Sequence, residues 1–247
     1  MTRFAVIGGT GLNQLEGLER LQEHALETPW GEPSHAVMRG RFAGQECLFL
    51  ARHGVPHHIP PHRINYQANL WALRELGAEA VLAVNAVGGI ASSMPSGQIV
   101  IPDQLVDYSW GRAHTFFDDT TVPVEHIDFT QPYDPALRQG LADSATRLGL
   151  ACSGEGVYGV TQGPRLETAA EIRKLRSDGC DVVGMTGMPE AALAAELGLP
   201  YAAICLVVNP AAGLGDEPIT LASMQSVLDQ GSQRIGTLLS GFLEDQG

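Results

Sequence analysis

Lysine is almost absent from this sequence, where Lys174 is its single occurrence, and basic residues are scarce as a whole. Lys and Arg together number 15 against 28 Asp and Glu, which gives a formal net charge of −13. A nucleic-acid-binding protein needs a basic surface to meet phosphates, so no nucleic-acid partner is expected. The P-loop segment G-x-x-x-x-G-K-[ST] is also missing, which argues against a P-loop nucleotide site.

Cysteines are few and far apart in the chain. Cys47, Cys152, Cys180 and Cys205 form no C-x-x-C pair, so a four-cysteine zinc site is not expected. No apolar run has the length of a membrane-spanning helix. The N-terminus lacks the charged segment and long apolar stretch of a signal peptide. We therefore expect a cytoplasmic protein with reduced thiols and no membrane partner.

The pattern of apolar residues predicts an α/β protein. The 247 residues, 44% of them hydrophobic, suffice for a large core, and no repeat or linker-like segment divides them. We predict a single domain over residues 1–247, with a mostly parallel or mixed central sheet flanked by helices. Strands are predicted at 4–7, 36–42, 46–51, 80–87, 98–102, 156–161, 181–185 and 201–208, and helices at 66–76, 135–148, 167–176, 189–197 and 219–243. Residues 108–134, with few apolar periodicities and many His, Asp, Thr and Pro, predict a long functional loop.

Polar side chains follow or close many of the predicted strands. They are Thr10, Arg52 and His53, Asn85, Thr161, Thr186 and Asn209. In open α/β sheets, ligands bind beyond the carboxyl ends of the strands. These side chains are therefore candidates for one shared site.

Two of these positions have chemistry that suits an anion. The turn Gly8-Gly9-Thr10-Gly11 allows backbone N–H groups to converge, and Thr10 adds a hydroxyl. The turn lacks the G-x-G-x-x-G spacing of dinucleotide sites, and glycines are ordinary in strand-to-helix turns. Arg52 offers a planar fork that matches phosphate oxygens, although a surface ion pair is the common role of arginine.

Glu167 and Asn209 each have a structural and a functional interpretation. Glu167 either stabilises a helix N-terminus or accepts N–H donors of a heterocycle. Asn209 is either a turn residue before Pro210 or a ligand contact whose amide offers both a donor and an acceptor to a purine edge. The residues alone leave both choices open.

A metal site and a covalent hydrolase are not favoured. His53, His57, His58 and His62 lie within ten residues, but prolines separate them and no carboxylate or thiol nearby completes a ligand set. No serine nucleophile elbow is present, and no cysteine stands beside a candidate base.

Several motifs, in order along nearly the whole chain, resemble the trimeric purine nucleoside phosphorylase family. The N-terminal motifs, at residues 7–12, 52–54 and 64–73, are most similar to its methylthioadenosine phosphorylase branch. Residues 85–89 resemble the family's central strand motif, and residues 184–190 resemble its ribose and phosphate segment. The resemblance implies a nucleoside phosphorylase fold and a pentosyltransferase that uses inorganic phosphate as co-substrate, with no metal or organic cofactor.

The resemblance also implies roles for the site residues. The phosphate-binding set would be Thr10, Arg52, His53, the backbone of Ala86, and Thr186. Met185 would pack against the ribose, and His57 would lie near the 5′ group of the substrate. His126, in the long loop, resembles the residue that a neighbouring subunit contributes there, which implies a homotrimer.

The purine end departs from the methylthioadenosine pattern. That branch has aspartates where Asn209 and Ala211 stand, because adenine needs an acceptor for its exocyclic amine and a proton donor for N7. An amide instead donates to N7 or to a 6-oxo group. Residues 163–168, around Glu167, resemble the inosine and guanosine phosphorylases, in which the glutamate accepts N1–H of a 6-oxopurine. Asn209 and Glu167 are therefore the implied catalytic residues.

The combined resemblance implies phosphorolysis of S-methyl-5′-thioinosine to hypoxanthine and 5-methylthioribose 1-phosphate in purine salvage. Methylthioadenosine and inosine or guanosine phosphorolysis are the alternatives within the family. A non-catalytic nucleotide- or phosphate-binding module is an alternative of another class, and it would bind without turnover. A Rossmann dehydrogenase is a third, but it needs an acidic residue at the end of the second strand, whereas Arg52 occupies a strand end here.

Overall fold

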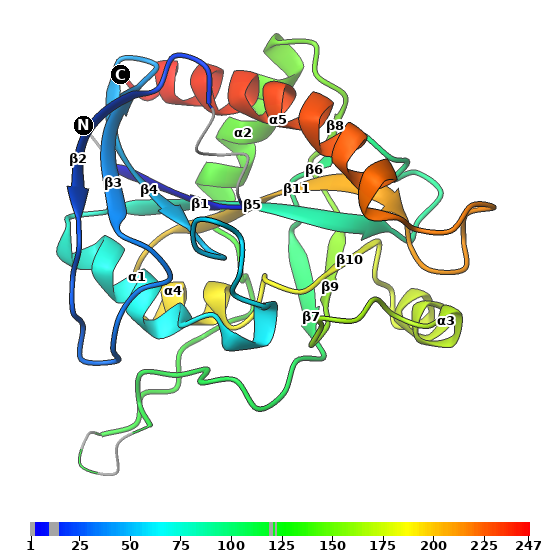
Figure 1. Ribbon diagram of the computed structural model, residues 1–247, viewed down its shortest axis with the longest axis horizontal. Helices are drawn as coiled ribbons and strands as arrows, with labels where there is room; N and C mark the ends of the chain where they lie inside the picture. Colours follow the sequence, from blue (N-terminus) through cyan, green and yellow to red (C-terminus); the bar gives the residue numbers. More distant parts are fainter. Residues whose placement is uncertain (1–2, 10–14, 119–120, 122) are drawn as a thin grey trace.

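A mixed β-sheet runs through the middle of the molecule, with helices on both of its faces (Figure 1). The computed structural model describes residues 3–9, 15–118, 121 and 123–247. Its strands are β1 Phe4–Gly8, β2 Glu19–His24, β3 Val37–Phe42, β4 Gln45–Ala51, β5 Ala80–Gly89, β6 Ile99–Val100, β7 Gln104–Asp107, β8 Cys152–Ser153, β9 Val157–Val160, β10 Val182–Gly184 and β11 Tyr201–Pro210. Its helices are α1 Tyr66–Glu75, α2 Pro135–Arg147, α3 Ala169–Ser177, α4 Glu190–Glu196 and α5 Leu221–Glu244, with a 3₁₀ turn at Pro61–Arg63.

The sheet combines parallel and antiparallel pairs. Its main path is β2-β3-β4-β1-β5-β10-β9-β7, with β11 beside β5 and β6, and β8 beside β6. Strand β1 is parallel to β4 and β5, and β11 is parallel to β5. Strand β10 is antiparallel to β5, and β2, β3 and β4 form antiparallel pairs. The predicted α/β fold with a mixed central sheet is thus confirmed.

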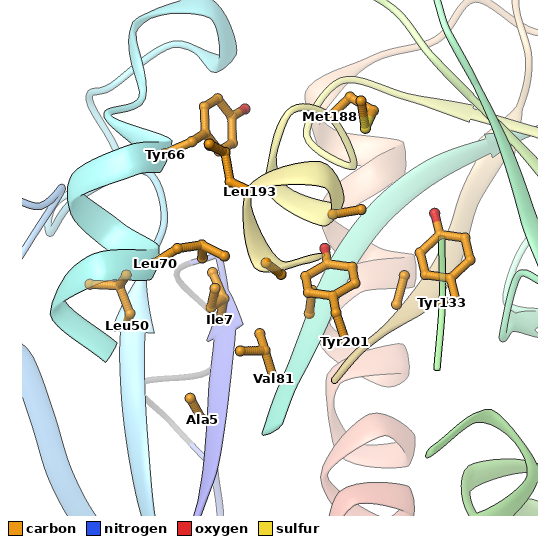
Figure 2. Packing of buried hydrophobic residues seen from close by; sticks show 14 of the residues in the cluster. Ala5, Ile7, Leu50, Tyr66, Leu70, Val81, Tyr133, Met188, Leu193 and Tyr201 are labelled. Atoms are coloured by element: carbon orange, nitrogen blue, oxygen red, sulfur yellow. The ribbon is translucent and has the colours of Figure 1, made fainter. Parts of the chain in front are cut away.

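The central strands are buried on both faces, which explains their continuous apolar runs. Alternate residues of a strand point to opposite faces. Ile7 of β1 therefore packs in the cluster that contains α1 and α4, whereas Phe4 packs in the cluster that contains α2 and α5. Figure 2 shows Leu70 of α1 beside Ile7, and Leu193 of α4 beside Tyr66 in the same cluster.

Local capping sets the helix boundaries. The Asn65 side chain accepts from the Ala68 N–H at 3.1 Å, as the sequence predicts for the start of α1. Helix α3 begins later than predicted, because Thr168 caps it in a reciprocal box with Glu171. Glu167 therefore lies before this helix and not at its first turn, so the prediction of a helix from 167 is wrong.

The strands that the sequence did not predict are short or polar. Strand β2 is an edge strand whose side chains are mostly exposed, so it lacks a buried apolar face. Strands β7 and β8 are also absent from the prediction, and β6 spans two residues of the predicted 98–102. The described part of the 108–134 loop contains no helix or strand, as expected. None of the described helices is long and apolar enough to cross a membrane.

Strand β5 changes its neighbour on one edge halfway along. Its first residues, Ala80 to Ala83, pair with β1, whereas Gly88 and Gly89 pair with β10. Strand β11 follows β5 along the other edge throughout. Residues 84–87 therefore lie where β1 has ended and β10 has not begun. Such a switch of neighbours is where α/β sheets bind ligands.

Candidate active site

A cavity of about 1510 Å³ opens at this part of β5. Eight of the ten predicted site residues line it, namely Arg52, His53, His57, Ala86, Glu167, Met185, Thr186 and Asn209. Thr10 lies outside the described residues, although the preceding Gly9 lines the cavity. His126 is exposed in the long loop and is not among the described lining residues.

Arg52 forms a buried ion pair with Glu190 at the wall of this cavity. Its Nε donates to Glu190 Oε2 at 2.7 Å, and its Nη2 donates to Oε1 at 2.8 Å. The Tyr201 hydroxyl also donates to Oε1, at 2.9 Å, and Arg52 and Glu190 are 1% and 0% exposed. Burial opposes the charge of Arg52, but the Glu190 carboxylate outweighs this effect and holds the pKa of the guanidinium above its ordinary value.

The ion pair leaves part of the guanidinium fork available for an anion. Arg52 Nη1 donates to the Val84 carbonyl at 2.9 Å, so the described residues engage three of the five N–H bonds of this arginine. The backbone groups of alternate strand residues point to the same edge of the strand. The N–H of Ala86 therefore points to the same edge as the Val84 carbonyl, toward Arg52. Arg52 and Ala86 both line the cavity, and two N–H bonds of Arg52 have no partner among the described residues.

Thr186 also lines the cavity, and its hydroxyl is oriented by Asn85. The Thr186 hydroxyl donates to Asn85 Oδ1 at 2.9 Å, and Asn85 Nδ2 donates to the Ala83 carbonyl at 3.0 Å. Both residues are buried. A hydroxyl can rotate to donate to another acceptor, so Thr186 is placed to serve an anion in the cavity.

His53 is held as a neutral ring. Its Nδ1 lies 2.8 Å from the Ile59 carbonyl, which can only accept, so Nδ1 carries the hydrogen and Nε2 keeps its lone pair. Burial lowers the pKa of His53 to about 4, and the charge of Arg52 acts in the same direction. The His57 ring stacks on it with centroids 4.2 Å apart.

Acid should therefore destabilise the fold through His53. Its pKa is about 4 when folded and about 6.5 when unfolded, so the unfolded chain binds the proton first as the pH falls. Stability is lost from about pH 6.5 downward, by about 2–3 kcal/mol near pH 4. Urea unfolding of the wild type and of His53→Gln at pH 7 and pH 4.5 measures this effect. His53→Gln should lose less stability; an equal loss in both proteins would contradict the assignment.

Glu167 and Asn209 also line the cavity. Thr161 donates its hydroxyl hydrogen to Glu167 Oε1 at 2.6 Å. Asn209 follows a bulge in β11, because Val207 pairs with Val87 and Asn209 already pairs with Gly88. A bulge re-aims the side chain that follows it. Asn209 Nδ2 donates one hydrogen to the Pro210 carbonyl at 2.6 Å. The second hydrogen of this amide has no partner in the described part of the chain and can donate to a ligand.

Arg112 is a buried arginine that no motif in the sequence singles out. It reaches from the long loop and donates from Nη1 to the Met185 carbonyl at 2.9 Å and to the Met188 carbonyl. Its Nη2 donates to the carbonyls of Thr161 at 3.1 Å and Gln162 at 2.9 Å. It thereby joins the segment that carries Thr186 to the segment that leads to Glu167.

Glu190 was also missed, because an acidic residue at the start of a helix has an ordinary explanation in the helix dipole. Its role is visible only when it is seen beside Arg52. Among the described residues, no group of three or more His, Cys, Asp and Glu side chains is placed to hold a metal ion.

The chain matches the family model described as the phosphorylase superfamily over residues 3–244. It belongs to the phosphorylase superfamily. One relative, named probable S-methyl-5′-thioinosine phosphorylase, from Pseudomonas syringae pv. tomato, is 55% identical over 98% of this chain and 99% of its own. The 6-oxopurine nucleoside phosphorylase of Pyrococcus furiosus is 44% identical over 97% of this phosphorylase and 91% of its own chain.

A solved structure has the same fold. Methylthioadenosine phosphorylase from Schistosoma mansoni, in complex with adenine, superposes with a TM-score of 0.93 at 28% identity, over 98% of this phosphorylase and 91% of the other chain. The predicted family is thus confirmed, and so is the predicted enzyme class, a pentosyltransferase of the purine nucleoside phosphorylase type.

Proposed function

We propose that this phosphorylase cleaves S-methyl-5′-thioinosine with inorganic phosphate, releasing hypoxanthine and 5-methylthioribose 1-phosphate. The observation that carries the proposal is that Glu167 and Asn209 both line the cavity. A carboxylate accepts N1–H of a 6-oxopurine, and an amide N–H donates to N7. The names of relatives at 49–55% identity, probable S-methyl-5′-thioinosine phosphorylases, support the same substrate.

The phosphate is proposed to bind where N–H donors converge beside β5. The free N–H bonds of Arg52, the backbone N–H of Ala86 and the Thr186 hydroxyl donate to its oxygens, with Thr10 completing the set. Neutral His53 accepts from the protonated phosphate oxygen through Nε2. These contacts hold the anionic nucleophile in line with the ribose. A global charge of −13 repels phosphate, so the local donors are essential.

The proposed reaction uses the phosphate-binding residues and the base-binding residues together. The bond between C1′ and the purine N9 stretches, and the ribose becomes oxocarbenium-like while Met185 packs against it. A phosphate oxygen forms the new bond to C1′, the electron pair of the broken bond moves into the purine, and the purine anion takes a proton from water to leave as hypoxanthine. Asn209 donates to N7, where negative charge develops, and Glu167 holds N1–H. The donor from Asn209 is preorganised for the charge of the transition state, whereas Glu167 binds the base in both the ground and the transition state.

The 5′ end of the substrate is proposed to lie near His57, with His126 supplied by a neighbouring subunit of a homotrimer. The exposed position of His126, away from its own cavity, supports this role. So do the large exposed apolar side chains Trp110 and Val124 of the same loop, which are 72% and 61% exposed. Sedimentation velocity tests the trimer.

The proposal has three further parts. The chain forms one domain over residues 1–247, the enzyme uses no metal or organic cofactor, and it is located in the cytoplasm.

Product analysis tests the reaction itself. The protein is incubated with methylthioinosine with and without inorganic phosphate, and the sugar product is identified by ³¹P NMR. The proposal expects hypoxanthine and a sugar 1-phosphate in equal amounts, and only with phosphate present. Release of free methylthioribose would show a hydrolase, and binding without release would show a non-catalytic module; either result contradicts the proposal.

A further inference from the structure

The carboxylate of Glu167 is held by a residue that does not itself line the cavity. The Thr161 hydroxyl lies 2.6 Å from Glu167 Oε1, and it closes strand β9 six residues earlier in the chain. We propose that Thr161 is a positioning residue that sets the selectivity for 6-oxopurines through Glu167. This inference rests on the proposed function, because it specifies how the same site reads the base.

Thr161 is held in place by hydrogen bonds of its own backbone, whereas Glu167 lies in a loop. The Thr161 N–H donates to the Gly184 carbonyl at 2.8 Å, and its own carbonyl accepts from Arg112 Nη2 at 3.1 Å. Thr161 is therefore fixed on both sides by neighbouring segments. Glu167 lies in the loop between β9 and α3, outside the capping box of that helix. A long side chain on a loop gains a defined direction only from what binds its tip.

Arg165, two residues before Glu167 in the chain, pairs with another carboxylate. Arg165 donates from both Nη atoms to the Glu171 carboxylate, at 2.8 Å in each case. A bidentate pair of this kind fixes the guanidinium geometry. Among the described residues, the hydrogen-bond donor to the Glu167 carboxylate is the Thr161 hydroxyl. The neutral hydroxyl, and not an arginine, orients this carboxylate.

The direction of the hydrogen bond decides what Glu167 can read. Thr161 has one hydroxyl hydrogen and two acceptors within reach, Glu167 Oε1 at 2.6 Å and the Gly184 carbonyl at 3.3 Å. The short distance to a charged acceptor favours the carboxylate. Glu167 then keeps Oε2 for the cavity as an acceptor only. A 6-oxopurine presents N1–H there, whereas a 6-aminopurine presents the N1 lone pair, which an acceptor repels.

Substitution by valine removes the hydroxyl and keeps the shape. Because Glu167 holds the base in both the ground and the transition state, Thr161→Val should raise KM for methylthioinosine about 10- to 100-fold while kcat changes less than about threefold. The Kd of hypoxanthine, measured by calorimetry, should rise by a similar factor. The preference for methylthioinosine over methylthioadenosine, as a ratio of kcat/KM, should fall in parallel.

Two variants serve as controls. Thr161→Ser restores a hydroxyl and should stay within about threefold of the wild type in all three quantities. Thr146→Val removes a threonine hydroxyl whose partner is the Ala142 carbonyl of α2, away from the site, and should change none of them. In a Glu167→Gln background, Thr161→Val should add less than about twofold, since the hydroxyl acts through that carboxylate.

The inference is overturned by any of three results. The first is a Thr161→Val protein with wild-type KM and base preference. The second is a Thr161→Ser protein as impaired as Thr161→Val. The third is a Thr161→Val protein whose kcat/KM falls equally for methylthioinosine and methylthioadenosine and whose melting temperature is lowered. That result would indicate a structural role. Hypoxanthine binding needs no turnover, so wild-type protein that binds hypoxanthine but does not cleave methylthioinosine would overturn the proposed function, while the Kd of Thr161→Val still decides the inference.

Discussion

Replacing Glu190 by alanine is expected to lower the free energy of unfolding by about 3–5 kcal/mol. The substitution leaves the Arg52 guanidinium charged and unpaired in a fully buried position, because Glu190 accepts two of its three hydrogen bonds. It also removes the acceptor of the buried Tyr201 hydroxyl. Without Glu190 the Arg52 guanidinium would no longer be held in one orientation. KM for phosphate should therefore rise, in addition to the loss of stability.

Denaturant unfolding and phosphate kinetics measure these two effects. Glu190→Gln is the milder variant, since it keeps the shape and one acceptor oxygen, and it serves if the alanine variant does not fold. Glu19→Ala is the matched control, because Glu19 pairs with Arg41 on the surface, with side chains 59% and 54% exposed. Such an exposed pair contributes about 0–1 kcal/mol. If Glu190→Ala costs no more stability than Glu19→Ala, the account of the buried ion pair is wrong.

Asn209→Asp is expected to shift the preference of the enzyme toward adenine bases. Loss of the amide donor to N7 should lower kcat for methylthioinosine by about 10²–10³. A carboxylate at this position repels the oxygen of a 6-oxopurine, whereas it accepts from the exocyclic amine of adenine and, when protonated, donates to N7. The ratio of kcat/KM for methylthioadenosine to that for methylthioinosine should therefore rise by about 10²-fold or more.

The variant Asn209→Ala distinguishes a loss of activity from a change in base preference. It should lower hypoxanthine release to a similar extent without a gain in adenine release. Both variants are assayed with the two nucleosides at saturating phosphate. An Asn209→Asp enzyme that keeps the full preference for hypoxanthine nucleosides would contradict the role given to Asn209.

The fold could be predicted from the sequence where burial leaves a local pattern. The apolar residues of β1 and β5 are continuous because both faces of these strands are covered, and Asn65 marks the start of α1. Strand β2 could not be predicted, because its pairing with β3 depends on backbone hydrogen bonds and its side chains are mostly exposed. Edge strands of this kind have no hydrophobic alternation.

The sequence predicts most of the cavity-lining residues of the candidate site, and their roles stay a prediction, but it predicts none of the contacts that hold them. Arg52 and Glu190 are 138 residues apart, and Arg112 and Met188 are 76 apart, so no local spacing reveals either contact. The sequence left Asn209 between a turn and a ligand contact. Its position at the cavity follows from the bulge in β11, which depends on the register with β5.

A competition assay tests the central proposal most directly. Equal concentrations of methylthioinosine, methylthioadenosine and inosine are mixed with the protein and inorganic phosphate, and the remaining nucleosides are followed by chromatography. Because the substrates compete for one site, their relative rates of loss give the ratios of kcat/KM. The account predicts that methylthioinosine disappears first, while methylthioadenosine and inosine remain. Faster loss of methylthioadenosine would contradict the proposal that Glu167 and Asn209 select a 6-oxopurine. Faster loss of inosine would contradict the proposal that the substrate carries a 5′-methylthio group.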